Sequence, residues 1–194
     1  MLVLVAIGAS AGGPRALSEI FRALPTDFPC PVVVVQHMTS GFVEGLVAWL
    51  AGEVAMPLRV AKDGDRLERG VGYFAPADRH VVVSADERLR LTDDPPRHSC
   101  RPSIDLLLQS VASVYGPRAV GVLLTGMGVD GAEGLLAIRR AGGRTIVQDE
   151  TSAAIFGIPR AAMKSGAAQM VLPLPLIPPT LLRLAQRAGV RGRK

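Results

Sequence analysis

Three segments of this sequence carry the residue types of a nucleophile, a general base and an orienting carboxylate. Ser10 stands among small residues, in Gly8-Ala-Ser-Ala-Gly-Gly13, and His37 follows a run of four valines and Gln36. Asp130 lies in a glycine-rich segment, Thr125-Gly-Met-Gly-Val-Asp-Gly131. These are the components of a hydrolytic triad, in which the histidine takes the serine proton and the carboxylate holds the imidazole.

The glycines around Ser10 predict a tight turn between a strand and a helix. Gly8 and Gly12 flank the serine as in a nucleophile elbow, which exposes the hydroxyl. The N-terminus of the following helix would offer N–H groups to a developing negative charge. The alternative is a structural glycine-rich turn in which Ser10 caps the helix or contacts a phosphate.

The other two candidates also have structural alternatives. We expect Asp130 to accept a hydrogen bond from Nδ1–H of His37, and the backbone N–H of Met127 or Gly128 to bind an oxyanion. Alternatively, His37 only caps its strand, and Asp130 only caps the next helix with Glu133 as its capping-box partner.

The remaining histidines and the familiar nucleotide motifs fit less well. His80 would open a hairpin strand and His98 lies in a loop, so both are poorer candidates for the base. A dinucleotide fingerprint would need glycine in place of Ser10 and an acidic residue where the second strand ends, at Gln36-His37. The order serine, histidine, aspartate also differs from that of the α/β-hydrolases.

These loops require strands and helices that bring them to one edge of a sheet. Apolar runs rich in Val and Ile predict buried strands, each followed by a turn and a helix. The predicted strands are 1–7, 31–35, 58–60, 119–124, 144–147 and 169–172, and the predicted helices are 14–24, 42–50, 103–114, 132–142 and 179–187. Residues 72–74, 80–83 and 88–91 are predicted to form antiparallel hairpins, and residues 93–98 a loop.

This alternation predicts an α/β fold: a doubly wound, mostly parallel sheet with helices on both faces and an antiparallel hairpin insertion. Ligands bind such sheets beyond the carboxyl ends of the strands. The candidate residues follow three of those ends. We expect residues 1–188 to form one catalytic domain and residues 189–194 a basic tail.

Composition limits the remaining classes of function. The 194 residues are 48% hydrophobic and 20% charged, which is typical of a folded globule. The net charge of +5 comes from the C-terminal end, because residues 1–182 contain 17 basic and 17 acidic side chains, so we expect no nucleic-acid binding. No apolar run is long enough for a membrane span. Cys30 and Cys100 form no CxxC pair, which argues against a zinc module and suits the cytoplasm.

Six segments together resemble the catalytic domain of the chemotaxis receptor methylesterases, the CheB family. They occur in the order of the family and cover about residues 3–185. The segments are Ile7-Gly-Ala-Ser-Ala-Gly-Gly13, Val35-Gln-His-Met38, Tyr73-Phe-Ala-Pro-Ala-Asp-Arg-His80, Arg101-Pro-Ser-Ile-Asp105, Leu124-Thr-Gly-Met-Gly-Val-Asp-Gly131, and Gln148-Asp-Glu-Thr-Ser152 with Phe156-Gly-Ile-Pro159.

The resemblance implies a serine esterase without a cofactor or metal. Ser10, His37 and Asp130 match the catalytic residues of the family, and Met127 matches a position whose N–H serves the oxyanion hole. Ala11, which would line the site, stands where the best-known members have threonine. The implied partners are methylated cytoplasmic helices of a chemoreceptor, and the implied products are a glutamate carboxylate and methanol. Some members also deamidate receptor glutamines.

The sequence leaves alternatives open for how the protein is regulated and for whether it acts as this esterase. The N-terminal receiver domain of typical members does not precede the first strand in this sequence, so we expect no phosphorylation in cis, while a receiver acting in trans stays open. A non-catalytic module that binds receptor helices or another signalling partner is the main alternative. An esterase for a different small ester is the second.

Overall fold

The computed structural model describes residues 3–190, without the side chains of residues 187–190. Its strands are β1 (Leu4–Ala9), β2 (Val32–Gln36), β3 (Leu58–Val60), β4 (Gly72–Phe74), β5 (His80–Val83), β6 (Leu89–Thr92), β7 (Ala119–Leu123), β8 (Arg144–Gln148) and β9 (Met170–Leu172). Its helices are α1 (Gly13–Ala23), α2 (Val43–Ala51), α3 (Ile104–Tyr115), α4 (Ala132–Arg140), α5 (Ile158–Lys164) and α6 (Ile177–Val190), with short 3₁₀ turns η1 (Gly116–Arg118) and η2 (Leu174–Leu176).

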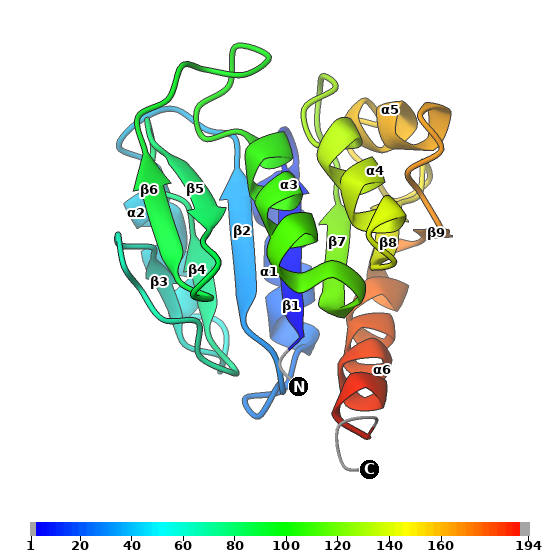
Figure 1. Ribbon diagram of the computed structural model, residues 1–194, viewed down its shortest axis with the longest axis horizontal. Coiled ribbons are helices and arrows are strands. Elements are labelled where there is room, and N and C mark those ends of the chain that lie inside the picture. Colours follow the sequence, from blue (N-terminus) through cyan, green and yellow to red (C-terminus); the bar gives the residue numbers. More distant parts are fainter. Residues whose placement is uncertain (1–2, 191–194) are drawn as a thin grey trace.

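Seven of these strands form one parallel sheet in the order β3-β4-β2-β1-β7-β8-β9. Strands β5 and β6 form a separate antiparallel hairpin. The strand order reverses direction between β1 and β7, which makes the carboxyl ends of these strands the topological switch point. The predicted parallel sheet with an antiparallel insertion is confirmed (Figure 1).

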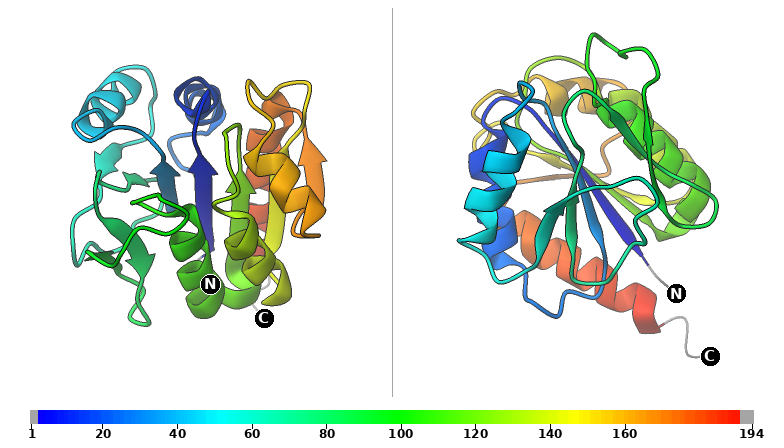
Figure 2. Two further views of the ribbon diagram at one scale, coloured as in Figure 1. Left: turned by 90° about the horizontal axis from the view of Figure 1, so that it is seen from above. Right: turned by 90° about the vertical axis from the view of Figure 1, so that its left-hand side faces the viewer.

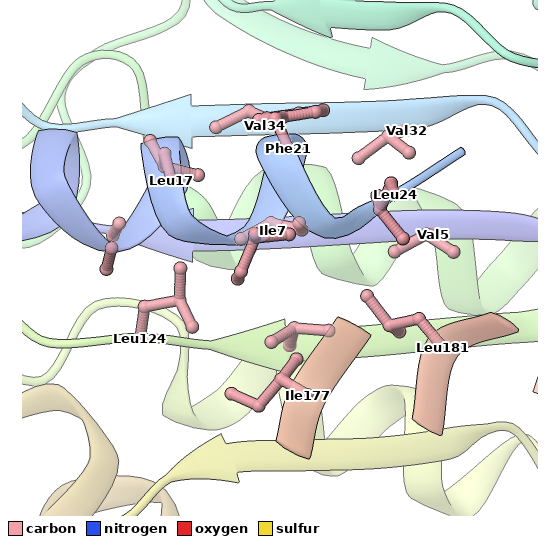
Figure 3. Packing of buried hydrophobic residues seen from close by; sticks show 14 of the residues in the cluster. Val5, Ile7, Leu17, Phe21, Leu24, Val32, Val34, Leu124, Ile177 and Leu181 are labelled. Carbon is pink, nitrogen blue, oxygen red and sulfur yellow. The ribbon is translucent and has the colours of Figure 1, made fainter. Parts of the chain in front are cut away.

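Alternate residues of the central strands face two hydrophobic layers. Val5 and Ile7 of β1 point into a cluster with α1, α2 and α6, whereas Leu4 and Ala6 face α3, α4 and α5. Figure 2 shows α1 and α6 on one side of the sheet and α3 on the other. Figure 3 shows Leu17 of α1 and other side chains of the first cluster beside the strands. Because both faces are covered, the strands read as continuous apolar runs.

The structure corrects two features of the sequence prediction. Gly72–Phe74 is not part of a hairpin: it pairs in parallel with β2 and β3 in the central sheet. Its flanking glycines suggested a hairpin, but the close packing of Gly72 against Leu58 and Phe21 places the segment inside the sheet. Helix α5 was not predicted, because its seven residues are too short to show a helical period.

Two further predictions concern the chain end and membranes. Residues 189 and 190 of the predicted basic tail lie in α6, and residues 191–194 lie outside the described residues. Among the described residues, no helix combines the length and apolar character needed to cross a membrane.

Candidate active site

The first of the three loops turns directly from β1 into α1. The N-cap of α1 is Gly12, with a left-handed φ of 80°, and Pro14 lies in the first turn as predicted. Ser10 is therefore not the helix cap, which removes the capping part of the structural alternative. Its N–H donates to the carbonyl of Thr125 at 3.0 Å, so the serine is joined to the loop after β7.

The glycine-rich loop after β7 passes in close contact with Ser10. A Cβ on Gly126 would lie 2.7 Å from Cβ of Ser10 and 3.0 Å from its backbone nitrogen. The Thr125 hydroxyl donates to the carbonyl of Ala11 at 2.9 Å, which makes a second bond between the two loops. Ala11, Met127 and Gly128 are exposed at this edge, with Met127 72% accessible. The predicted site-lining residues thus lie on neighbouring loops.

His37 and Asp130, which are far apart in the sequence, are in direct contact. Nε2 of His37 lies 2.9 Å from Oδ2 of Asp130, and the two side chains are 15% and 3% exposed. The ring nitrogen differs from our expectation, which placed the carboxylate at Nδ1. With its proton on Nε2 and donated to the carboxylate, a neutral imidazole leaves Nδ1 as its basic atom.

Asp130 caps a helix, but not the one that follows it. Gly131 is the N-cap of α4, and the N–H of Gly134 in the first turn of that helix donates to the carboxylate of Asp105 at 2.6 Å, not to Asp130. The Asp130 carboxylate instead accepts hydrogen bonds at the start of α3, from the hydroxyl of Ser103 at 2.8 Å and from the N–H groups of Ile104 and Asp105 at 2.7 and 3.0 Å. The expected capping-box partner, Glu133, pairs with Arg97 instead.

These contacts set the charge of the carboxylate. Burial acts to raise the pKa of Asp130, but the hydrogen bonds from His37, the backbone at Asp105 and Ile104, and Ser103 outweigh it and hold the pKa below its ordinary value. Asp130 is therefore an anion at neutral pH, and it favours a proton on Nε2 of His37.

Ser10 and His37 are neighbours because each directly follows the last residue of one of two paired strands, β1 and β2. The His37 N–H donates to the carbonyl of Ala9 at 2.9 Å, and Ala9 and Gln36 are paired in the sheet. Among residues 3–190, however, the Ser10 hydroxyl has no hydrogen-bond partner. Catalytic hydrogen bonds are often long without substrate and shorten in the complex, so this geometry is compatible with a nucleophile.

Sequence reasoning did not single out Gln36, which joins the nucleophile and base segments. Its side-chain amide donates to the carbonyl of Ser10 at 2.9 Å and to that of His37 at 2.8 Å. Gln148 plays a comparable part at the end of β8, where its carbonyl accepts from the Thr125 N–H at 2.8 Å. Gln36 and Gln148 are the last residues of buried strands. The signal in the sequence that could have identified them is a glutamine at the end of an apolar run, directly before a loop.

The other two histidines have structural partners. His80 is fully buried, accepts the Ser103 N–H on Nδ1 at 3.0 Å, and contacts the carbonyl of Pro95 through Nε2 at 3.2 Å. His98 lies 3.3 Å from Oδ2 of Asp105. Burial is the main cause that raises the pKa of Asp105, and the nearby Asp130 adds to it.

Comparison with known proteins supports one family. The pattern of the CheB methylesterases matches residues 5–181. A protein-glutamate methylesterase/protein-glutamine glutaminase of Anaeromyxobacter dehalogenans is 50% identical over 94% of this chain and 53% of its own length. The protein-glutamate methylesterase FrzG of Myxococcus xanthus is 46% identical over 93% of this chain and 54% of its own length.

A solved structure agrees with this result. The CheB methylesterase catalytic domain of Thermotoga maritima superposes with a TM-score of 0.92 at 36% identity, and the match covers 95% of this chain and 99% of that one. The chain spans about half the length of the curated relatives it matches. On the family pattern, the identities and the shared fold, this chain belongs to the CheB methylesterase family.

Proposed function

We propose that this domain is a cytoplasmic serine hydrolase that removes methyl esters from glutamate side chains of chemoreceptor helices. The observation that carries the proposal is the contact between His37 and the buried, ionised Asp130, beside Ser10 at the switch point of the sheet. Among the relatives, the protein from A. dehalogenans is named as both a methylesterase and a glutaminase, so receptor glutamines are a second substrate class.

In the proposed mechanism, each of these residues has a defined role. Ser10 Oγ attacks the ester carbonyl and its proton passes to Nδ1 of His37, while Asp130 accepts the Nε2–H and stabilises the imidazolium. The N–H groups of Met127 and Gly128 stabilise the oxyanion, and Ala11 lines the site. Methanol leaves with the proton from His37. Water, deprotonated by His37, then attacks the acyl-serine and releases the glutamate carboxylate.

Methanol release from radiomethyl-labelled chemoreceptor membranes tests the reaction. We expect the Ser10→Ala variant to lose activity by about 10⁴-fold or more, because the nucleophile of a serine triad is removed. Ser40→Ala is the matched control, because Ser40 is an exposed serine in the loop after His37. Activity of Ser10→Ala equal to that of the wild type would refute the proposal.

A second measurement separates catalysis from binding alone. A fluorophosphonate should label Ser10 in the wild type, because His37 activates the hydroxyl, and should not label Ser10→Ala. A module that only binds receptor helices would leave the probe unreacted. Labelling without methanol release would indicate a different ester substrate, or a receiver domain that must act in trans.

A further inference from the structure

Cys100, a residue that the proposed mechanism does not use, lies beside the basic nitrogen of His37. Its Sγ is 3.8 Å from Nδ1, whereas the Asp130 carboxylate contacts the other ring nitrogen, Nε2. The cysteine precedes α3 and is held by two backbone hydrogen bonds with Arg97, at 2.8 and 3.1 Å. A thiol and an imidazole nitrogen are thus held side by side in a partly exposed site.

The distance between these atoms suits a tetrahedral cation. Zinc binds thiolate at about 2.3 Å and imidazole at about 2.0 to 2.1 Å, so the tetrahedral angle separates the two ligand atoms by about 3.5 Å. The observed distance of 3.8 Å is close to this separation. His37, Cys100 and Asp130 carry potential ligand atoms that all lie within 4.8 Å of one another.

Asp130 strengthens this geometry without binding the cation. Histidines that bind metals through one ring nitrogen usually donate the other N–H to a carboxylate, which fixes the ring and makes it a better ligand. His37 has this arrangement, since Nε2 contacts Asp130 and Nδ1 faces Cys100. The pair is also accessible, because the His37 side chain is 15% exposed and Cys100 is half-buried.

We propose that Nδ1 of His37 and Sγ of Cys100 form an inhibitory site for a thiophilic divalent cation such as Zn²⁺ or Cd²⁺. On binding, the thiol releases its proton to solvent, and the cation occupies the Nδ1 lone pair. His37 then cannot accept the proton of Ser10, so the cation stops ester hydrolysis. The inhibition rests on the proposed function, whereas the binding of the cation does not.

A second cluster of potential ligands fits a cation less well. His98, Asp105 and Glu133 also have ligand atoms within 4.8 Å of one another. The Arg97 guanidinium, however, pairs with Glu133 and lies 4.0 Å from Asp105, so a positive charge is already present there. This cluster supplies a control for the location of binding.

Direct binding of Zn²⁺ and Cd²⁺ to the purified chain tests the proposal without substrate. We expect one Zn²⁺ per chain by equilibrium dialysis and a cadmium–thiolate charge-transfer band in the ultraviolet. Cys100→Ser and His37→Ala should both lose saturable zinc binding, and Cys100→Ser should lose the cadmium band. Asp130→Asn should weaken zinc binding by about 10- to 100-fold, as expected when the partner of a metal-binding histidine is removed.

Two matched variants should keep the zinc binding of the wild type. Cys30→Ala removes the other cysteine, which is buried, and His98→Ala removes the histidine of the second cluster. The proposal is overturned if the wild type shows no saturable binding, if Cys100→Ser binds zinc as the wild type does, or if His98→Ala abolishes binding.

Inhibition is then measured as the ratio of methanol release with and without Zn²⁺ for each protein. Zinc should lower this ratio in the wild type and in Cys30→Ala, with Mg²⁺ as the inactive control because it prefers oxygen ligands. Saturable zinc binding at Cys100 with unchanged hydrolysis would overturn the inhibitory role. A chain that binds zinc but never hydrolyses the ester would refute the proposed function and leave the metal site in place.

Discussion

At the residue scale, the carboxylate of Asp130 joins the imidazole to a helix end. It accepts hydrogen bonds from His37, from the Ser103 hydroxyl and from two backbone N–H groups of α3. The N-terminus of a helix favours an anion, because its N–H groups lack partners within the helix. The same contacts therefore orient the base and anchor the start of α3.

The low pKa of Asp130 predicts how stability depends on pH. A carboxylate whose pKa is lowered on folding stabilises the protein above the pKa of the unfolded state, about 3.9, and this contribution is lost as the pH falls through the lower folded pKa. We expect Asp130→Asn to flatten this part of the curve of unfolding free energy against pH, measured by urea denaturation. Asp27→Asn, which removes an exposed carboxylate, controls for the change of charge. Equal acid slopes for Asp130→Asn and wild type would contradict the assignment.

At the scale of elements, three strand ends and one helix start define the site. Strands β1, β2 and β7 are neighbours in the sheet, so the loops that follow them emerge side by side. Gly126 lets the loop after β7 pass against Ser10, since any Cβ there would meet the serine. The close approach of backbones, together with the bonds of Gln36, holds the nucleophile loop in place.

A methyl group at Gly126 should disturb this arrangement. In Gly126→Ala, the new Cβ would lie 2.7 Å from Cβ of Ser10 and from Cδ1 of Ile158, and Ser10 has to move because its backbone is also in contact. A displacement of about 1 Å lowers turnover by about 10²-fold, which methanol release would measure.

Gly45→Ala is the matched control, because Gly45 lies in α2 and an added Cβ there would point into open space. It should keep wild-type turnover, and its better helix propensity should raise stability by about 0.5 to 1 kcal/mol. Full activity of Gly126→Ala would show that the loop can yield without moving the nucleophile.

At the scale of the whole molecule, the site depends on a sheet that is covered on both faces. Helices α1, α2 and α6 pack on one face, and α3, α4 and α5 on the other. Leu181 of α6 is fully buried in the first layer (Figure 3), and α6 supplies none of the residues of the candidate site. Stability and catalysis can therefore be separated by substitution in α6.

Leu181→Ala should destabilise the fold without changing the chemistry. Truncation of a buried leucine costs about 2 to 5 kcal/mol, which urea denaturation would measure, while methanol release per folded molecule should stay at the wild-type value. Leu176→Ala removes a leucine that is 52% exposed and should change stability by less than about 0.5 kcal/mol. A large loss of turnover in folded Leu181→Ala would show that α6 acts on the site.

Local patterns in the sequence were sufficient to predict most of the fold. Continuous Val and Ile runs indicated buried parallel strands, and the segments after them contained Ser10, His37 and Asp130. Periodicity could not separate the parallel strand Gly72–Phe74 from a hairpin strand, because a three-residue segment carries no record of its partner. Helix α5 was missed because its seven residues are likewise too few to show a helical period.

Sequence alone therefore determined the class of fold, the family resemblance and the residue types available for chemistry, because these follow from local pattern and motif. Only the tertiary structure decided which atoms meet. It placed Asp130 on Nε2 of His37 and at the start of α3, left Nδ1 facing Cys100, and put Gln36 between the two loops. Such contacts depend on strand order and backbone direction at distant positions, which spacing along the chain does not encode.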